Sequence, residues 1–238
     1  MRVEVRAKLT VPKYGNAPEE CEDVVAVGDV RVAVSDGATT SSYSREWAQL
    51  LADRYVEQPP RRVDAGWLAP IQESFAADRA RVPLPWYAEA KLEEGTYATL
   101  LGLDFDLDHG CWSALAVGDT CAFCIFEGRL RHSLPLHASA AFSNRPFLVG
   151  TRGAHGLDKP GRQFRHRRRP LVPGMTFVVA TDALAAWCWR MVEAGNPPWD
   201  MLLRIGDISS LMSHVAAERA SGAMRNDDVA LAIVEIKP

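Results

Sequence analysis

The apolar positions divide the chain into alternating β and α segments. Strict alternation or short continuous apolar runs predict strands, whereas apolar residues spaced three and four apart predict helices. Strands are expected at residues 3–10, 24–27, 31–35, 96–104, 111–117, 121–127, 129–133, 175–181 and 229–236. Helices are expected at residues 45–56, 67–81, 86–94, 183–194, 199–205 and 208–221.

Turn and cap residues separate these segments. The Gly-Asp pair at 28–29 predicts a hairpin turn between the second and third strands. Residues 41–44, Ser-Ser-Tyr-Ser, supply N-cap candidates for the first helix, and two prolines at 59–60 end it. Residues 134–170 are polar and rich in loop formers, so a long loop is expected there.

The order of the segments favours a single α+β domain. Strands and helices come in separate runs, which is typical of layered α+β proteins rather than of doubly wound parallel sheets. At 238 residues the chain is long enough for one core, and no repeat, low-complexity tract or composition break marks a linker. We therefore expect one domain over residues 1–238.

Charge and hydropathy argue against several classes of protein. A formal net charge of −3 provides no general attraction to nucleic acid or to an anionic membrane surface. The N-terminus lacks the apolar core of a signal peptide, and no apolar stretch approaches membrane-spanning length. A cytoplasmic protein with no nucleic-acid or membrane partner is expected.

The five cysteines are expected to be buried thiols. Their number is odd, and three of them lie within apolar runs. Cys121 and Cys124 have the spacing of a redox or zinc motif, but residues three apart on a strand face opposite sides of a sheet. No second ligand pair at zinc-like spacing accompanies them, so small hydrophobic thiols are favoured.

Three aspartates stand at the ends of strongly apolar runs. Asp36 follows the third predicted strand, Asp182 follows a later buried strand, and Asp227 precedes the closing strand. Carboxylates held at strand ends can converge on one hard cation, and oxygen-only ligands suit Mg²⁺ or Mn²⁺. Each also has an ordinary explanation. Asp36-Gly37 is a common turn pair, Asp182 can cap a helix, and Arg225 can pair with one of the carboxylates at 227–228.

Two further acidic positions admit two interpretations. Glu22-Asp23 opens the second strand and would approach Asp36 if the hairpin forms, although a solvated loop charge is the simpler explanation. Asp119 lies in a Gly-Asp-Thr sequence that reads by default as a hairpin turn.

The basic and histidine residues are also ambiguous. The run at 162–169 either attracts an acidic or phosphorylated partner or is a solvated loop or a strand edge whose charges protect against aggregation. His155 and His166 are candidate acid–base groups, but six histidines are dispersed along the chain, which favours surface or packing roles.

Taken in order, the acidic positions resemble the motif series of the PP2C-type metal-dependent protein phosphatases. The strand-end residues agree with that series in flanking hydrophobicity as well as in order, and the match spans nearly the whole chain. The members are Glu22-Asp23, Asp36-Gly37, the strand motif at 95–99, Gly118-Asp119-Thr120, Thr181-Asp182 and Asp227-Asp228. The set is specific, although no single member is.

The resemblance implies a fold and a metal centre. The fold would be an α-β-β-α sandwich of two antiparallel sheets flanked by helices, with two Mg²⁺ or Mn²⁺ ions bound at one end. Asp36 would bridge the two ions, and Asp119 would bind a third, labile ion together with Asp182. The implied ligands are the side chains of Glu22, Asp36, Asp119, Asp182 and Asp227 and the carbonyl of Gly37.

The resemblance also implies a reaction and its partners. The reaction would be hydrolysis of phosphoserine or phosphothreonine on a protein by a metal-bridged water, with Asp36, Asp182 and Asp227 catalytic through that water. The partners would be a phosphoprotein substrate and the Ser/Thr kinase whose action the enzyme opposes.

The chain departs from the family where the substrate phosphate is held. An Arg that many members place just before the Glu-Asp pair is absent from residues 16–20, and Lys13 and Arg45 are candidate replacements. The alternative is a catalytically weak or inactive pseudophosphatase that binds phosphoproteins as a regulatory module. A third option is a non-enzymatic layered protein, which convergence of Asp36, Asp182 and Asp227 would argue against.

Overall fold

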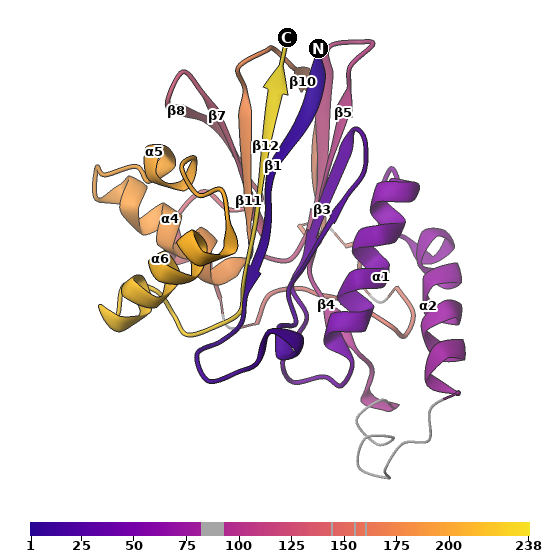
Figure 1. Ribbon diagram of the computed structural model, residues 1–238. Coiled ribbons are helices and arrows are strands. Elements are labelled where there is room, and N and C mark those ends of the chain that lie inside the picture. The colour runs from indigo at the N-terminus through magenta and orange to yellow at the C-terminus, as the bar shows by residue number, and fades with distance from the viewer. Residues whose placement is uncertain (82–92, 144, 155, 160) are drawn as a thin grey trace.

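Two five-stranded antiparallel sheets form a sandwich at the centre of the molecule (Figure 1). The computed structural model describes residues 1–81, 93–143, 145–154, 156–159 and 161–238. One sheet has the order β1 (Arg2–Val11), β12 (Val229–Lys237), β11 (Thr176–Ala180), β7 (Cys121–Phe126) and β8 (Arg129–Leu134). The other has the order β10 (Phe164–Pro170), β6 (Cys111–Val117), β5 (Leu100–Asp106), β3 (Arg31–Ser35) and β2 (Val24–Val27). A third, two-stranded sheet pairs β4 (Tyr97–Ala98) with β9 (Val149–Gly150).

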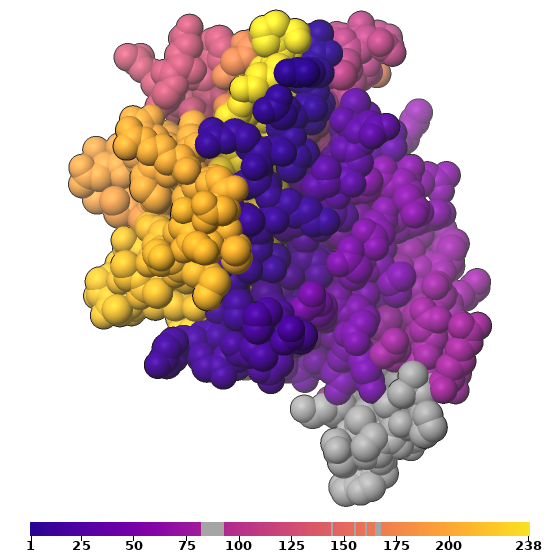
Figure 2. Space-filling view, in the orientation of Figure 1, coloured from indigo at the N-terminus to yellow at the C-terminus, as the bar shows by residue number. Residues whose placement is uncertain are grey.

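Helices cover the outer face of each sheet. On the β2–β3–β5 side lie α1 (Ser44–Glu57) and α2 (Ala65–Arg79), and on the β11–β12 side lie α4 (Asp182–Glu193), α5 (Trp199–Leu202) and α6 (Ile208–Ala220). Short 3-10 helices occur at Pro18–Glu20 and Ser139–Ala141. Figure 2 shows the N-terminal strand, in indigo, between the orange and yellow C-terminal helices and the violet helices of the other face. The predicted α-β-β-α sandwich is therefore observed.

Three apolar layers hold these elements together. Between the sheets, Phe177 makes edge-to-face contacts with Phe105 and Trp112 at ring-centroid distances of 5.0 and 4.9 Å. Cys124 lies in this layer, whereas Cys121 lies in the layer between the sheet and α4. All five cysteines are free and buried, as predicted. The alternation along β7 thus decides the environment of both thiols.

The structure corrects two local predictions about turns and caps. The N-cap of α1 is Tyr43, which has a left-handed backbone (φ 61°) and makes no side-chain cap hydrogen bond. The serines at 41–44 therefore do not cap the helix. The Gly-Asp-Thr sequence at 118–120 is not a hairpin, because β6 and β7 belong to different sheets and the chain crosses between them there.

The expected loop at 134–170 contains two strands, β9 and β10. Residues 164–169 of the basic run lie in β10, which pairs with β6 at the edge of its sheet, so this part of the run is a strand edge. Arg168 pairs with Asp106 at 3.2 Å. His155, the His166 side chain and most of the predicted helix at 86–94 lie outside the described residues. Among the described residues, no helix has the length and apolar character needed to span a bilayer.

Candidate metal centre

The end of β3 fixes the position of Asp36. The backbone N–H of Asp36 donates to Thr99 Oγ1 at 2.9 Å, and its carbonyl accepts from the Thr99 N–H at 2.8 Å. Thr99 occupies the break between β4 and β5, where a continuous strand is expected from the sequence. Its hydroxyl also bonds the Thr120 hydroxyl at 2.7 Å. Thr99 therefore ties the end of β3 to the crossing turn that carries Asp119.

Three carboxylates meet at this end of the sandwich. Asp36, Asp119 and Asp182 each offer one oxygen, and these oxygens all lie within 4.8 Å of one another. Asp36 comes from one sheet, Asp119 from the crossing turn, and Asp182 from the start of α4 directly after β11 in the other sheet. The cluster is thus formed by three segments that are far apart in the sequence.

The cluster concentrates negative charge away from water. Burial is the largest cause that raises the pKa of Asp36 well above its usual range, and the charges of Asp23 and Asp182 raise it further. Burial, with Asp182 adding to it, raises the pKa of Asp119 to about 7. Burial also raises the pKa of Asp182, although Arg225 partly offsets this.

These residues fit a hard divalent cation. Both oxygens of Asp119 are buried and have no hydrogen-bond partner among the described residues. An unpartnered buried carboxylate is costly, and a dication among three of them would offset that cost by favouring their ionised forms. Oxygen ligands without His or Cys are those that Mg²⁺ and Mn²⁺ prefer.

Gly37 permits close approach of three chain segments beside Asp36. A Cβ at this position would lie 2.8 Å from the backbone carbon of Ser44 and 2.9 Å from the carbonyl oxygen of Glu22. Any side chain would therefore push α1 and the β1–β2 loop apart. The glycine brings Glu22 and the start of α1 against the end of β3.

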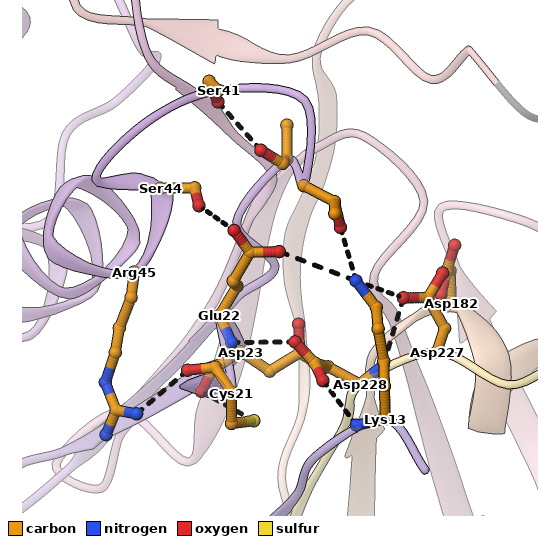
Figure 3. Close-up of polar contacts among 12 residues, drawn as sticks. Lys13, Cys21, Glu22, Asp23, Ser41, Ser44, Arg45, Asp182, Asp227 and Asp228 are labelled. Atoms are coloured by element: carbon orange, nitrogen blue, oxygen red, sulfur yellow. Dashed lines mark hydrogen bonds and ion pairs between the residues drawn. The ribbon is translucent and has the colours of Figure 1, made fainter. Parts of the chain in front are cut away.

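Glu22 contacts Lys13, which in turn contacts Asp227 (Figure 3). One oxygen of Glu22 accepts a hydrogen bond from the Ser44 hydroxyl, and the other lies 3.6 Å from Lys13 Nζ. Lys13 Nζ also lies 3.2 Å from Asp227 Oδ1 and donates to Thr39 Oγ1 at 2.5 Å. Burial opposes the charge on Lys13, but Asp227 and other carboxylates raise its pKa overall. Lys13 therefore joins Glu22 to Asp227.

Asp227 is linked to the cluster through Arg225. The Nη2 atom of Arg225 donates to Asp182 Oδ2 and lies 2.8 Å from Asp227 Oδ2. Asp227 is 30% exposed and is not among the three residues whose oxygens lie within 4.8 Å of one another. Asp36 and Asp182 thus converge with Asp119, while Asp227 and Glu22 surround them and contact the two basic side chains.

Two buried aspartates lie close to the centre, and the sequence did not assign either of them a role there. Asp228 accepts from the backbone N–H of Lys13 at 2.7 Å and of Glu22 at 2.8 Å, so it fastens the β1–β2 loop to the start of β12. Asp23 is 2% exposed, and burial raises its pKa well above the usual range, although Thr181 lowers this pKa in part. A charged residue directly before a buried apolar strand is the sequence signal common to both.

Arg45 does not contact the carboxylates. Its Nη1 atom donates to the carbonyls of Pro18, Glu19 and Cys21 at 3.0–3.2 Å and so stabilises the β1–β2 loop. Figure 3 shows it directed away from Asp182 and Asp227, in contrast to Lys13. Of the two candidate replacements for the family arginine, Lys13 is the one at the centre.

We expect Thr99→Val to weaken both the fold and metal binding. Valine keeps the shape of the side chain but removes the partner of the Asp36 N–H and of the Thr120 hydroxyl. Losing these buried bonds should reduce the free energy of unfolding by about 2 kcal/mol, measured by urea denaturation. Mn²⁺ affinity should fall about 10- to 100-fold in calorimetric titration, because Asp36 loses its support. Thr99→Ser is the control, and wild-type Mn²⁺ affinity in Thr99→Val would contradict the role of Thr99.

Comparison with known proteins finds the same fold in solved structures of serine/threonine phosphatases. No family model matches the sequence. No curated protein matches it either. Among solved structures, the Mycobacterium tuberculosis serine/threonine phosphatase PstP is 14% identical at a TM-score of 0.64, with 100% of each chain covered. The PstP catalytic domain in complex with two manganese ions is 15% identical at a TM-score of 0.60, covering 100% of this chain and 99% of that chain. The S. agalactiae serine/threonine phosphatase is 13% identical at a TM-score of 0.55, covering 99% of this chain and 100% of that chain.

Proposed function

Since the chain has the fold of the PP2C-type serine/threonine phosphatases, we propose that it is a metal-dependent phosphatase acting on phosphoserine or phosphothreonine in proteins. The observation that carries this proposal is the convergence of Asp36, Asp119 and Asp182, with oxygens within 4.8 Å of one another and raised pKa values. Such a cluster is unfavourable without a cation, so a purely structural role does not explain it.

The chain's own residues would have distinct tasks. Asp36 and Asp182, together with Asp227, would hold the ions that matter for catalysis, and Asp119 would add a ligand at the buried side. Glu22 and the Gly37 carbonyl would complete the centre. Two dications, when bound, lower the pKa of a water and offset charge on phosphoryl oxygens. Either Mg²⁺ or Mn²⁺ suits these ligands.

Lys13 would contact the substrate phosphate. Its side chain is 19% exposed, and its ammonium lies between Glu22 and Asp227, at the edge of the centre. An ammonium beside metal ligands can add a charge-assisted hydrogen bond to a phosphoryl oxygen. The backbone bond from Lys13 to Asp228 fixes this residue in place.

The proposal implies a phosphoprotein partner and a Ser/Thr kinase that phosphorylates the same protein. We also propose a cytoplasmic setting, because five buried free thiols are compatible with a reducing compartment.

A second function is favoured by one observation. Lys13 and Arg225 already contact the carboxylates, so the centre has two internal cations. A pseudophosphatase that binds phosphoproteins as a regulatory module could retain its fold with these cations in place of metals. Such a protein would bind a phosphopeptide without releasing phosphate.

Hydrolysis of p-nitrophenyl phosphate as a function of Mn²⁺ concentration separates the two functions. An enzyme should show saturable, Mn²⁺-dependent release of p-nitrophenol that EDTA abolishes. Absence of turnover in folded protein, with phosphopeptide binding retained, would instead support the regulatory module.

A further inference from the structure

Arg225 lies at the outer side of the carboxylate cluster. It is in the segment between α6 and β12, and its side chain is 49% exposed, compared with 14% for Asp182 and 30% for Asp227. The guanidinium therefore stands between these carboxylates and solvent. An anionic group that approaches Asp182 on this side would meet Arg225.

The guanidinium uses only one of its nitrogens in these contacts. Nη2 reaches both Asp182 Oδ2 and Asp227 Oδ2, so neither carboxylate is held by a bidentate pair. Nε and Nη1 form no hydrogen bond or ion pair in the part of the chain that the structure describes. Nε and Nη1 thus remain available as single donors on a half-exposed side chain, while each two-donor edge of the guanidinium includes Nη2.

Neighbouring arginines differ from Arg225 in this respect. Arg219 donates to the carbonyls of Pro12 and Asp227, and Arg45 donates to three carbonyls of the β1–β2 loop. Their charged groups hold loops in place. Within the described ranges, the side chain of Arg225, in contrast, contacts only carboxylates that are proposed to hold metal ions.

We propose that Arg225 binds a phosphoryl oxyanion at the metal centre and, without metal, serves as the counter-ion of Asp182 and Asp227. This inference rests on the proposed function. Once a metal ion on Asp182 and Asp227 releases Nη2, a two-donor edge of the guanidinium matches two oxygens of a phosphoryl group. A guanidinium at Asp182 and Asp227 lies beside the ions that these residues would hold, where the phosphoryl group of a substrate must lie.

The same contacts make Arg225 a competitor of the metal. A dication bound to Asp182 and Asp227 would neutralise the negative charge that Arg225 Nη2 neutralises when no metal is bound. Metal binding must therefore break or weaken the ion pairs of Arg225. Once those carboxylates hold a cation, the guanidinium gains more from an oxyanion than from them. Removing the arginine should therefore have opposite effects on metal and on phosphate.

Calorimetric titration of Mn²⁺ into metal-free protein tests the competition. Arg225→Gln should bind Mn²⁺ about two- to fivefold more tightly than wild type, because no half-exposed ion pair has to be displaced. Arg225→Lys keeps the charge and should remain close to wild type. Arg204→Gln is the matched control, since Arg204 is exposed and makes no described contact with the carboxylates.

Binding of inorganic phosphate to the Mn²⁺-loaded protein, followed by calorimetry, tests the oxyanion contact without requiring turnover. Arg225→Gln should weaken phosphate binding about tenfold or more, Arg225→Lys should weaken it less, and Arg204→Gln should leave it unchanged. If Arg225→Gln binds Mn²⁺ more tightly, as expected, any loss of phosphate binding does not come from a damaged metal site.

The outcomes separate this inference from the proposed function. If wild type binds Mn²⁺ and hydrolyses substrate but Arg225→Gln matches it in both titrations, Arg225 has no such role while the enzyme assignment stands. If wild type binds Mn²⁺ and phosphate without turnover and Arg225→Gln shifts both, the contact stands and the enzyme assignment fails. Wild type that binds no Mn²⁺ overturns both.

Discussion

Asp36→Asn is expected to reduce Mn²⁺-dependent hydrolysis about a thousandfold or more, which corresponds to about 4 kcal/mol of lost transition-state stabilisation. Asp36 lies at the point where the ends of both sheets and the crossing turn meet, and its oxygen is within 4.8 Å of those of Asp119 and Asp182. An amide offers one neutral oxygen in place of a shared negative charge, so it cannot replace Asp36 in its proposed role as a carboxylate shared by two dications.

The same substitution should stabilise the metal-free protein. Burial and neighbouring carboxylates oppose the ionised form of Asp36, and asparagine removes that opposition while keeping the shape of the side chain. The free energy of unfolding in EDTA at pH 7.5 should rise by about 1 kcal/mol or more. Asp29→Asn is the control, because Asp29 is exposed at the other end of the same hairpin. Full activity in Asp36→Asn would remove this residue from the centre.

The metal-free protein is expected to lose stability as pH rises from about 4 to about 7. Asp119 has a pKa of about 7 in the folded protein against a reference value of 3.8, so the folded state binds more protons than the unfolded state between these values. Stability therefore falls with increasing pH, by about 4 kcal/mol if this carboxyl titrates alone. The raised pKa values of Asp23, Asp36 and Asp182 act in the same direction.

Saturating Mn²⁺ should reverse this dependence. A bound dication favours ionised carboxylates, so it stabilises the folded protein more as pH rises and protons no longer compete. Urea denaturation from pH 4.5 to 8, with EDTA and with Mn²⁺, measures both curves. Parallel curves with and without Mn²⁺ would show that the carboxylates do not bind the metal.

The strand-end positions of the acidic residues could be predicted because they depend on local pattern. Apolar runs placed Asp36 after β3, Asp182 after β11 and Asp227 before β12, and the structure has these strands in those places. The resemblance of the motif series to the PP2C-type phosphatases then implied that these strand ends meet at one end of a sandwich. A buried strand leaves little freedom for the residue at its end, so sequence pattern and tertiary position coincide there.

Features that depend on long-range charge or on a strand edge could not be predicted in the same way. β10 is rich in arginine and lacks apolar alternation, and only its pairing with β6 makes it a strand. The positions of Lys13 and Arg225 depend on the paths of two loops. Neither residue has a local signal that distinguishes it from the other basic residues, and Arg45 has an equally suggestive position in the sequence but bonds loop carbonyls.

Calorimetric titration of Mn²⁺ into the metal-free wild-type and Asp36→Asn proteins at pH 7.5 tests most directly whether the buried carboxylates form a divalent-cation centre. Wild type should show saturable binding of about two ions per chain, as two-metal hydrolytic centres do. Asp36→Asn should lose this saturable binding. Equal binding by the two proteins, or no saturable binding by a folded wild type, would contradict a metal centre built on Asp36, Asp119 and Asp182.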